Sequence, residues 1–526
     1  MVTTEGTVAA VDGAVGIGAR KVDSKRTAPL VVIALALIAW SGYAYAVVRV
    51  NADILAEAIQ VQQWLSDPFW VVSYPGQVHG GVLEYPLIAM AETLFPGNVY
   101  GLTLIRILYI PLVGLLLASC FSMAQPHRSL WPFAAAAAVG PAVLHGFRLI
   151  SDIYPSAWLI SAVGVWLVFH WASGRWASWG VAFAGGLLIG LGIYQHASAA
   201  VLSIPLLAFA AVQWRVRVSQ GLWVLVGIVI GLIPMGLAMF AQPGKAVVYR
   251  PERSGLPDVI GALGLDRGEL GWREAMLPNG LGVAHADSTF LDLGWSVQWW
   301  INLIAVLFVL AVVIVGVFMT RSALGWMWLA ALAVIVGLVV FVPPIWYYGT
   351  PVGFLLWFSI GFAPVLLPRM AEWIVIAVVL GISAGFSFAQ VWNSHPRFLT
   401  GAQVKAEQVA EVDEVASAIE DAGVEYVFGD YWEVLPIAYA SSSSVHPISY
   451  NFNRFPLDPA DVGEEIVVAV TPGTIALPFG RDSWTLSAEA LALVDQACIP
   501  VPDITSRLPD EVTAHLCPTA VLMERR

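Results

Sequence analysis

The sequence predicts an α-helical polytopic membrane protein with a small α/β domain at its C-terminal end. Of its 526 residues, 58% are hydrophobic and 12% are charged, and the mean hydropathy is +0.76. A water-soluble protein of this size needs a more polar surface, so most of the chain is expected to lie in lipid. The apolar residues form long runs, and the basic residues fall in alternate connections between those runs.

Long apolar runs give the number of membrane spans. About eleven runs are long enough to cross a hydrocarbon layer of ~30 Å. They cover approximately residues 28–50, 100–122, 129–146, 154–172, 176–194, 196–213, 220–241, 297–319, 323–342, 349–367 and 371–391.

Basic residues in the short connections predict the orientation, because cytoplasmic loops carry the excess of Lys and Arg. With the N-terminus inside, every inner connection contains a base: Arg20, Lys21, Lys25 and Arg26 before the first span, then Arg128, Arg175, Arg215, Arg217, Arg321 and Arg369. The outer connections are acidic and include two long loops, 51–99 and 243–296. This alternation predicts an odd number of spans and an external C-terminal part.

The predicted domains follow from these runs. Residues 1–27 are expected to be a disordered cytoplasmic tail, 28–392 the membrane module and 393–526 a soluble extracytoplasmic α/β domain. In that last part, 406–423 has helical spacing of apolar residues and ends on glycine, whereas 424–429 and 464–470 have the pattern of short buried strands. Cys498 and Cys517 lie there, and the sequence allows either a disulfide or two free thiols.

Carboxylates collect beside the outer boundaries of the spans. Asp53, Glu84 and Asp152 each lie next to such a boundary. Burying a carboxylate near lipid is costly unless it is paired or faces water, so the sequence predicts that the three share one wet cavity. Glu57 lies one helical turn after Asp53, in a stretch expected to form an amphipathic helix over 54–65, and we interpret it as part of a solvated polar face.

Basic side chains are predicted on the same outer side. They are Arg49, His79, Arg106, His145, Arg148 and His196. Arg106 lies inside a span, where it is either functional or paired with a carboxylate. Carboxylates and bases together at the outer interface suit a phosphorylated lipid substrate, because the bases hold phosphate while a carboxylate accepts a proton. Tyr348 belongs to a set of aromatic residues that either stack on sugar rings or anchor helices.

Three stretches of the chain resemble a known family. SYPGQVHGGVLEYPLIAM (73–90), GGLLIGLGIYQHASAAVLSIP (185–205) and GVEYVFGDYWEVLPIAYAS (423–441) look like segments found, in this order, in bacterial membrane glycosyltransferases of the C-type superfamily (GT-C). The resemblance implies a polyprenyl-phosphate-sugar donor that enters from the outer leaflet of the cytoplasmic membrane. It also implies a periplasmic C-terminal domain and an acceptor that is a glycan, a lipid or a protein.

The resemblance also implies roles for individual residues. Asp53 matches the acid of the first external loop and Asp152 the second acidic site. Glu84 falls where related aminosugar transferases place a carboxylate that helps to bind a divalent cation such as Mg or Mn. The chain departs from the family where an Arg-Tyr before a proline is expected, because WYYGTP (346–351) stands there. It also lacks the adjacent Asp-Glu pair of protein mannosyltransferases, since Asn51 and Ala52 precede Asp53.

These observations lead to a hypothesis of membrane glycosyl transfer. Asp53 acts on the acceptor hydroxyl, Glu84 and Asp152 shape the site, and Arg148, Arg106, His79, His196 and Tyr348 contact the donor. The alternatives are a polymerase of lipid-linked polysaccharide, a transporter or lipid flippase, and a structural scaffold. The net charge of −12 argues against a nucleic-acid partner. The sugar, the acceptor, the stereochemistry and the oligomeric state do not follow from the sequence.

Overall fold

The structure is a computed structural model of the whole chain. It describes residues 24–47, 52–66, 80–138, 154–241, 322–341, 349–362, 369–450, 462–471, 488–510 and 512–523, together with six isolated positions at 300, 303, 307, 310, 314 and 455.

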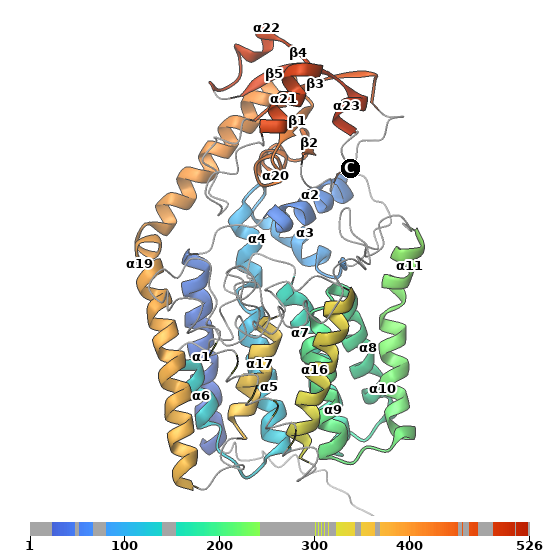
Figure 1. Cartoon of the computed structure of the whole chain (residues 1–526), viewed down its shortest axis with the longest axis vertical. Coiled ribbons are helices and arrows are strands. Elements are labelled where there is room, and N and C mark those ends of the chain that lie inside the picture. The colour runs from blue at the N-terminus through green and yellow to red at the C-terminus, as the bar shows by residue number, and fades with distance from the viewer. Residues whose placement is uncertain are drawn as a thin grey trace, which may run out of the picture.

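A bundle of apolar helices forms one end of the molecule, and a small domain with a β-sheet forms the other (Figure 1). The bundle contains α1 (Ser24–Val47), α4 (Val99–Arg106), α5 (Tyr109–Ala124), α6 (Trp131–Ala138), α7 (Tyr154–Ala172), α8 (Trp179–Gln195), α9 (Ala199–Gln213), α10 (Val218–Gly231), α11 (Ile233–Ala241), α16 (Ala323–Phe341), α17 (Gly349–Ile360) and the first half of α19 (Arg369–Asp421).

Four helical stretches among the described residues are long and apolar enough to cross a membrane: Thr27–Ala46, Tyr100–Ala124, Tyr154–Ala172 and Val218–Phe240. Shorter apolar helices cover 179–195, 198–213, 323–338 and 350–359. These eight stretches coincide with eight of the runs expected from the sequence, so the chain is a polytopic membrane protein. The expected span 297–319 and the second half of 129–146 lie mostly outside the described residues, and the count of eleven stays a prediction.

Helix α8 comes from a run rich in glycine. Its close packing against α10 stabilises this run as a helix. A Cβ atom at Gly186 would lie 2.1 Å from the carbonyl oxygen of Val224 on α10. The two backbones therefore approach more closely than side chains allow, which is how small residues stabilise helix pairs in lipid. This contact fixes α8, whose C-terminal end reaches the candidate site.

The first long loop, which the sequence predicts to be external, contains two helices, α2 (Ala52–Ser66) and α3 (Tyr85–Leu94). They lie between the bundle and the C-terminal domain (Figure 1). The helix expected over 54–65 is thus confirmed as α2. Its expected amphipathic character is not confirmed, because all residues from 54 to 59 are fully buried. Buried apolar residues of α2, α3 and α4 pack with residues of α19 and of α20 (Tyr431–Ala440), including Ile54, Ile88, Val412 and Leu435.

Helix α19 is one continuous helix of 53 residues. The sequence predicted two separate helices here, a span over 371–391 and a second helix over 406–423. The structure joins them, so the last span continues directly into the C-terminal domain. Figure 1 shows α19 running along the side of the bundle and beyond it to the sheet.

The C-terminal domain is built on a five-stranded mixed sheet in the order β2-β1-β3-β5-β4. Its strands are β1 (Tyr426–Gly429), β2 (His446–Ser449), β3 (Glu465–Val470), β4 (Ile499–Pro500) and β5 (Thr513–Pro518), and its other helices are α21 (Ala488–Ala497), α22 (Pro502–Thr505) and α23 (Thr519–Met523). Strand β1 is parallel to β2 and β3, whereas β5 is antiparallel to β3 and β4. The expected strands 424–429 and 464–470 correspond to β1 and β3.

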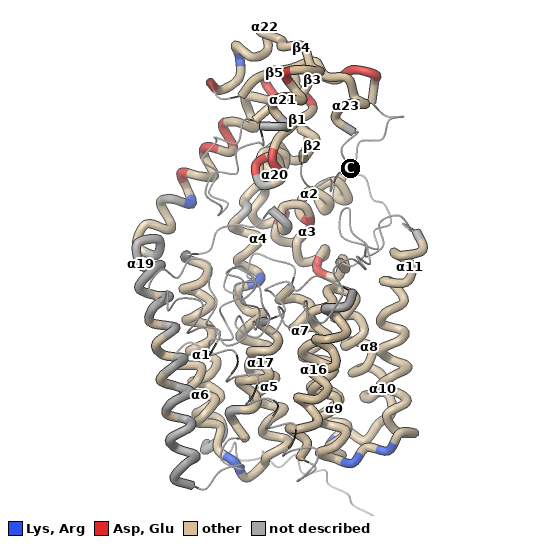
Figure 2. The backbone as a smooth tube through the Cα atoms, in the orientation of Figure 1, with Lys and Arg blue, Asp and Glu red and all other residues tan. Residues whose placement is uncertain are grey.

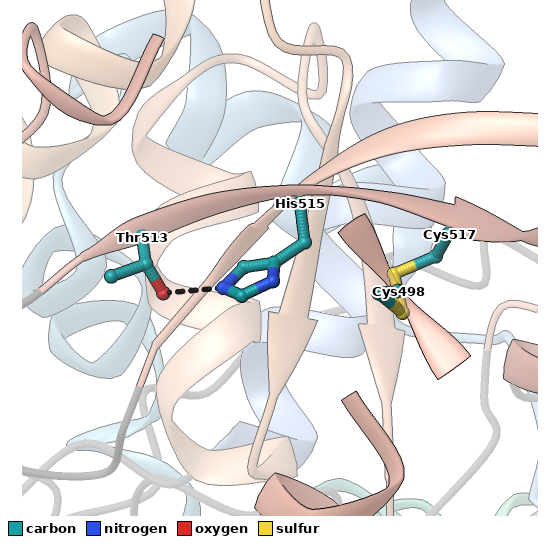
Figure 3. The surroundings of a disulfide bond; sticks show 4 residues. All are labelled: Cys498, Thr513, His515 and Cys517. Atoms are coloured by element: carbon teal, nitrogen blue, oxygen red, sulfur yellow. Dashed lines mark hydrogen bonds between the residues drawn. A yellow bond between two sulfur atoms is a disulfide. The ribbon is translucent and has the colours of Figure 1, made fainter. Parts of the chain in front are cut away.

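Cys498 and Cys517 form a disulfide in this domain, which answers the question left open by the sequence. Cys517 lies on β5, beside the hydrogen-bonded pair His515 and Thr513 (Figure 3). The third cysteine, Cys120, is free and buried in α5. Structural disulfides belong to proteins exposed to an oxidising compartment.

The charged residues are distributed unequally along the molecule. Lys and Arg lie where α5 meets α6 and where α9 meets α10, at the end of the bundle away from the sheet, whereas most Asp and Glu lie on the upper part of α19 and on the C-terminal domain (Figure 2). This separation agrees with the alternation of basic and acidic connections in the sequence.

Candidate functional site

The candidate site lies where α2 and α3 meet the ends of the membrane helices that are nearer to the C-terminal domain (Figure 1). Among the predicted residues, Asp53 is in the first turn of α2, Glu84 directly precedes α3, Arg106 ends α4 and His196 directly follows α8. The side chain of Asp53 lies outside the described part of the structure. Six further predicted residues also lie outside it: Arg49, His79, His145, Arg148, Asp152 and Tyr348. Whether Asp53, Glu84 and Asp152 share one cavity therefore stays a prediction.

Arg106 joins two carboxylates at the centre of this site. Its Nε donates to Glu84 Oε1 at 2.6 Å and its Nη2 to Glu84 Oε2 at 3.0 Å, which is a bidentate pair. The same Nη2 also donates to Glu57 Oε2 at 2.6 Å. We call Glu57, Glu84 and Arg106 the buried triad.

The interrupted helix explains how an arginine from a membrane span reaches these carboxylates. Helix α4 ends at Arg106, a turn occupies 107–108, and α5 begins at Tyr109. Tyr109 lies close enough to Arg106 and Glu84 to interact with both electrostatically. Arg106 Nη1 has no hydrogen-bond partner within the described ranges.

The triad is shielded from solvent. Relative exposure is 0% for Glu57, 3% for Glu84 and 1% for Arg106. Two carboxylates and one guanidinium leave an excess of one negative charge if all three are ionised. Removing one partner of such a buried pair costs about 3–5 kcal/mol, because the remaining charge is left uncompensated.

The interpretation of Glu57 as part of a solvated polar face is wrong. The side chain is fully buried and is paired with Arg106, which lies 49 positions further along the chain. For Arg106, the structure supports the second of the two readings that the sequence allowed, pairing with carboxylates. Helical spacing shows which residues share a face, but it does not show what that face packs against.

A divalent cation at Glu84 does not fit this arrangement. Both carboxylate oxygens of Glu84 accept hydrogen bonds from the guanidinium, so a second cation would have to approach against that positive charge. Elsewhere in the described part of the chain, no group of three or more His, Cys, Asp and Glu side chains could hold a metal ion. No step below is routed through a metal.

The segment that carries Glu84 is held against the end of α8. Gly81 N donates to Gln195 O at 3.0 Å, and Leu83 N donates to Gln195 Oε1 at 3.0 Å. Gly80 and His196 form an antiparallel bridge. A Cβ atom at Gly81 would lie 2.7 Å from Gln195 Cα, so this close approach requires glycine.

His196 is hydrogen-bonded within the protein. Its Nδ1 lies 2.8 Å from the Ser198 hydroxyl and accepts from Ser198 N at 3.2 Å. Trp158 Nε1 in turn donates to the same hydroxyl at 2.8 Å. Because Nδ1 accepts, the ring proton belongs on Nε2 in the neutral form. His196 is 3% exposed and so acts on a ligand only if its surroundings move.

A third buried carboxylate, Glu92 on α3, was not predicted as a site residue from the sequence. Tyr439 donates to Glu92 Oε1 at 2.5 Å, and Gln62 Nε2 donates to Glu92 Oε2 at 3.0 Å. Burial raises the pKa of Glu92 above its ordinary value, although both hydrogen bonds oppose that shift. One feature of the sequence indicated a buried site here, because Glu92 is an acidic residue in a mostly apolar helix. Its partner Tyr439 on α20 is 347 positions away, so the contact itself could not be predicted.

Comparisons with known proteins identify no family by sequence. No protein-family model matches the chain, and no curated protein matches it. Two solved structures are similar in three dimensions: ArnT from Cupriavidus metallidurans bound to undecaprenyl phosphate, at 13% identity, and the same protein in the apo state, at 14% identity. Each covers 93% of this chain and 98% of its own, with a TM-score of 0.47. At this score and identity the likeness does not establish a shared activity.

Proposed function

We propose that this chain is a membrane glycosyltransferase that moves a sugar from a polyprenyl-phosphate donor to an acceptor at the outer face of the cytoplasmic membrane. The observation that carries the proposal is the buried triad. It joins α2, the helix that contains Asp53, to the end of α4. This contact supports the proposal that Asp53 acts on a lipid whose phosphate lies at the membrane surface.

The arrangement favours chemistry at the outer interface over transport through the bundle. A permeation path needs ionisable groups deep inside several spans. The buried ionisable groups described above lie instead at the junction of α2, α3 and α4, outside the centre of the bundle. The disulfide Cys498–Cys517 supports an extracytoplasmic location of the C-terminal domain, which packs directly on α2 and α3.

In the proposed reaction, Asp53 accepts the proton of the acceptor hydroxyl. The acceptor oxygen forms a bond with the anomeric carbon of the sugar, and the bond between that carbon and the phosphate oxygen breaks. The polyprenyl phosphate leaves with the electron pair. Arg148 is the basic residue proposed to offset its charge. The guanidinium of Arg106 is committed to Glu57 and Glu84, and its part is to hold the site together.

The test uses the purified protein in lipid nanodiscs with a panel of polyprenyl-phosphate sugars, beginning with undecaprenyl carriers. The expected result is release of free polyprenyl phosphate by the wild type and loss of that release in Asp53→Asn. Glu414→Gln is the matched control, because Glu414 is an exposed carboxylate on α19 far along the chain from α2. Full activity of Asp53→Asn would exclude Asp53 as the base.

The same assay distinguishes transfer from flipping. A flippase moves the lipid-linked sugar across the bilayer without breaking the bond between sugar and phosphate. Movement of intact donor across proteoliposomes, with no free lipid phosphate from any donor, would overturn the proposed transfer.

A further inference from the structure

We propose that Glu57, Glu84 and Arg106 form a positioning triad, through which the interrupted span α4–α5 sets the place of the helix that carries Asp53. This inference rests on the proposed function, because it assigns the triad a part in that reaction. None of the three residues is placed in contact with substrate.

One nitrogen atom of Arg106 contacts both carboxylates of the triad. Arg106 Nη2 donates to Glu57 Oε2 at 2.6 Å and to Glu84 Oε2 at 3.0 Å. Both carboxylates are therefore within hydrogen-bond reach of the same atom, and Nε holds the other oxygen of Glu84 at 2.6 Å. Because a guanidinium is planar and rigid, these bonds fix α2 relative to the start of α3 in direction as well as in distance.

Apolar packing alone does not supply this direction. Ile54, Ala58 and Ile59 of α2 are fully buried and already hold the helix against its neighbours. Burial of apolar surface is non-directional. The hydrogen bond from Gln62 to Glu92 of α3 holds the later part of α2, whereas the triad holds its first turns, where Asp53 lies. A buried ion cluster is often no more stabilising than apolar residues of the same volume, and its best-attested role is to specify one arrangement.

The orientation of α2 affects the proposed reaction because Asp53 lies on this helix. Helix α2 begins at Ala52, so position 53 is in its first turn and one turn before Glu57. Any rotation of α2 about its axis moves positions 53 and 57 together. A misplacement of about 1 Å at a reacting group lowers a rate by about 100-fold, and a loss of this order is the expected effect of releasing the helix.

The experiment compares three variants with the wild type in nanodiscs. Arg106→Gln leaves two buried carboxylates uncompensated, and we expect a lower unfolding temperature together with loss of activity. The triple variant Glu57→Gln, Glu84→Gln and Arg106→Gln has no buried charge and keeps amides that form hydrogen bonds. We expect it to unfold near the wild-type temperature, while kcat falls by about 100-fold and KM changes by less than about threefold. Glu414→Gln is the exposed control and should match the wild type.

A distance measurement tests the triad without relying on activity. Spin labels at Ser66→Cys on α2 and Thr93→Cys on α3 occupy exposed positions, and the natural cysteines are either buried or in the disulfide. We expect a narrow distribution of distances between the labels in the wild type and a broader one in the triple variant.

The outcomes separate the two proposals. A wild type that transfers no sugar from any donor would overturn the proposed function. An active wild type with a triple variant of unchanged kcat, or an unchanged distance distribution in the triple variant, would overturn the positioning role of the triad.

Discussion

Tyr439 of the C-terminal domain donates a hydrogen bond of 2.5 Å to Glu92 of α3, across 347 positions of sequence. Gln62 of α2 donates to the other oxygen of Glu92, and the Ser443 hydroxyl donates to Gln62 Oε1 at 2.8 Å. These bonds connect α20 to α3 and α2. These hydrogen bonds hold the C-terminal domain against the helices that contain the candidate site. A substitution at this junction should therefore also alter the geometry of the site.

Tyr439→Phe should destabilise this junction. The variant removes the hydroxyl and leaves Glu92 Oε1 without its donor in a site where Glu92 is 7% exposed. A buried acceptor that loses its donor costs about 1–3 kcal/mol. Thermal unfolding in nanodiscs should show the loss, and amide hydrogen exchange should become faster in α20.

Thr93→Ala is the control for that variant, because Thr93 is exposed on the same helix and its hydroxyl bonds to Ala89 O within the helix. It should leave both measurements unchanged. If Tyr439→Phe unfolded and exchanged like the wild type, the hydrogen bond to Glu92 would not hold the domain in place.

The junction should also respond to pH. Burial raises the pKa of Glu92 above its ordinary value, so the folded protein binds a proton at Glu92 more tightly than the unfolded chain does. The stabilisation by protonated Glu92 is therefore fully present below the unfolded pKa of about 4.3 and is lost as pH rises through the higher folded value. The groups that face this carboxyl are Tyr439, Gln62 and the backbone of Gly97.

Comparison of the wild type with Glu92→Gln isolates this group. The wild type should lose stability relative to Glu92→Gln as the pH is raised from about 4.3 to 7, because the variant cannot ionise at position 92. The measurement is the difference between the two unfolding temperatures at each pH. A difference that stays constant, or that changes in the opposite direction, would contradict a raised pKa.

Much of the membrane module could be predicted from the sequence, because a run of apolar residues must be long enough to cross lipid and its length is visible directly. The span predicted at 154–172 coincides with α7, and the amphipathic pattern of 54–65 coincides with α2. The continuous helix α19 was not predicted, since the apolar run ends near 391 and Pro396 follows it. Strands β2, β4 and β5 were not predicted, although β5 is as long as β3, and their pairing depends on contacts across the domain.

The candidate site was predicted less completely, because its contacts are distant in sequence. The sequence identified Glu84 as a charge at a membrane boundary and Arg106 as a charge inside a span. Their shared contact with Glu57 could not be predicted, because it forms only where α2, the start of α3 and the end of α4 meet. Residue type shows that a buried charge needs a partner. It does not show which partner, and for Glu57 this led to the wrong interpretation.

Gly81→Ala should disturb the segment that carries Glu84. The added Cβ would lie 2.7 Å from both Gln195 Cα and Gln195 Oε1, which is too close for either atom to remain in place. Overpacking of this kind costs about 1–3 kcal/mol, and the shift should also displace Glu84, three residues further on. We expect a lower unfolding temperature and a lower rate of sugar transfer in the same nanodisc assay.

Gly42→Ala is the matched control for Gly81→Ala. Gly42 lies in α1, and a Cβ there would meet no heavy atom within 4 Å. Because alanine is favoured over glycine inside a helix by about 1 kcal/mol, this variant should unfold at the same temperature or slightly higher. Equal behaviour of the two variants would mean that the segment 80–83 tolerates a wider separation from α8.

The disulfide gives a prediction about both stability and location. Cys498 and Cys517 are 19 positions apart, and closing a loop of this length stabilises a folded domain by about 3 kcal/mol in the chain-entropy account. The double variant Cys498→Ala and Cys517→Ala should therefore unfold at a lower temperature. A reductant should lower the unfolding temperature of the wild type toward that of the double variant and leave the double variant unchanged, so each protein serves as the other's control.

The location follows from the compartment in which the disulfide persists. Disulfides form outside the reducing cytoplasm, so Asp503→Cys, at an exposed position of the same domain, should react in intact cells with a maleimide that does not cross membranes. The natural cysteines are protected by burial or by the disulfide and should give little background. Labelling that requires permeabilised cells would place the domain, and the candidate site packed against it, on the cytoplasmic side, where a donor in the outer leaflet cannot reach it.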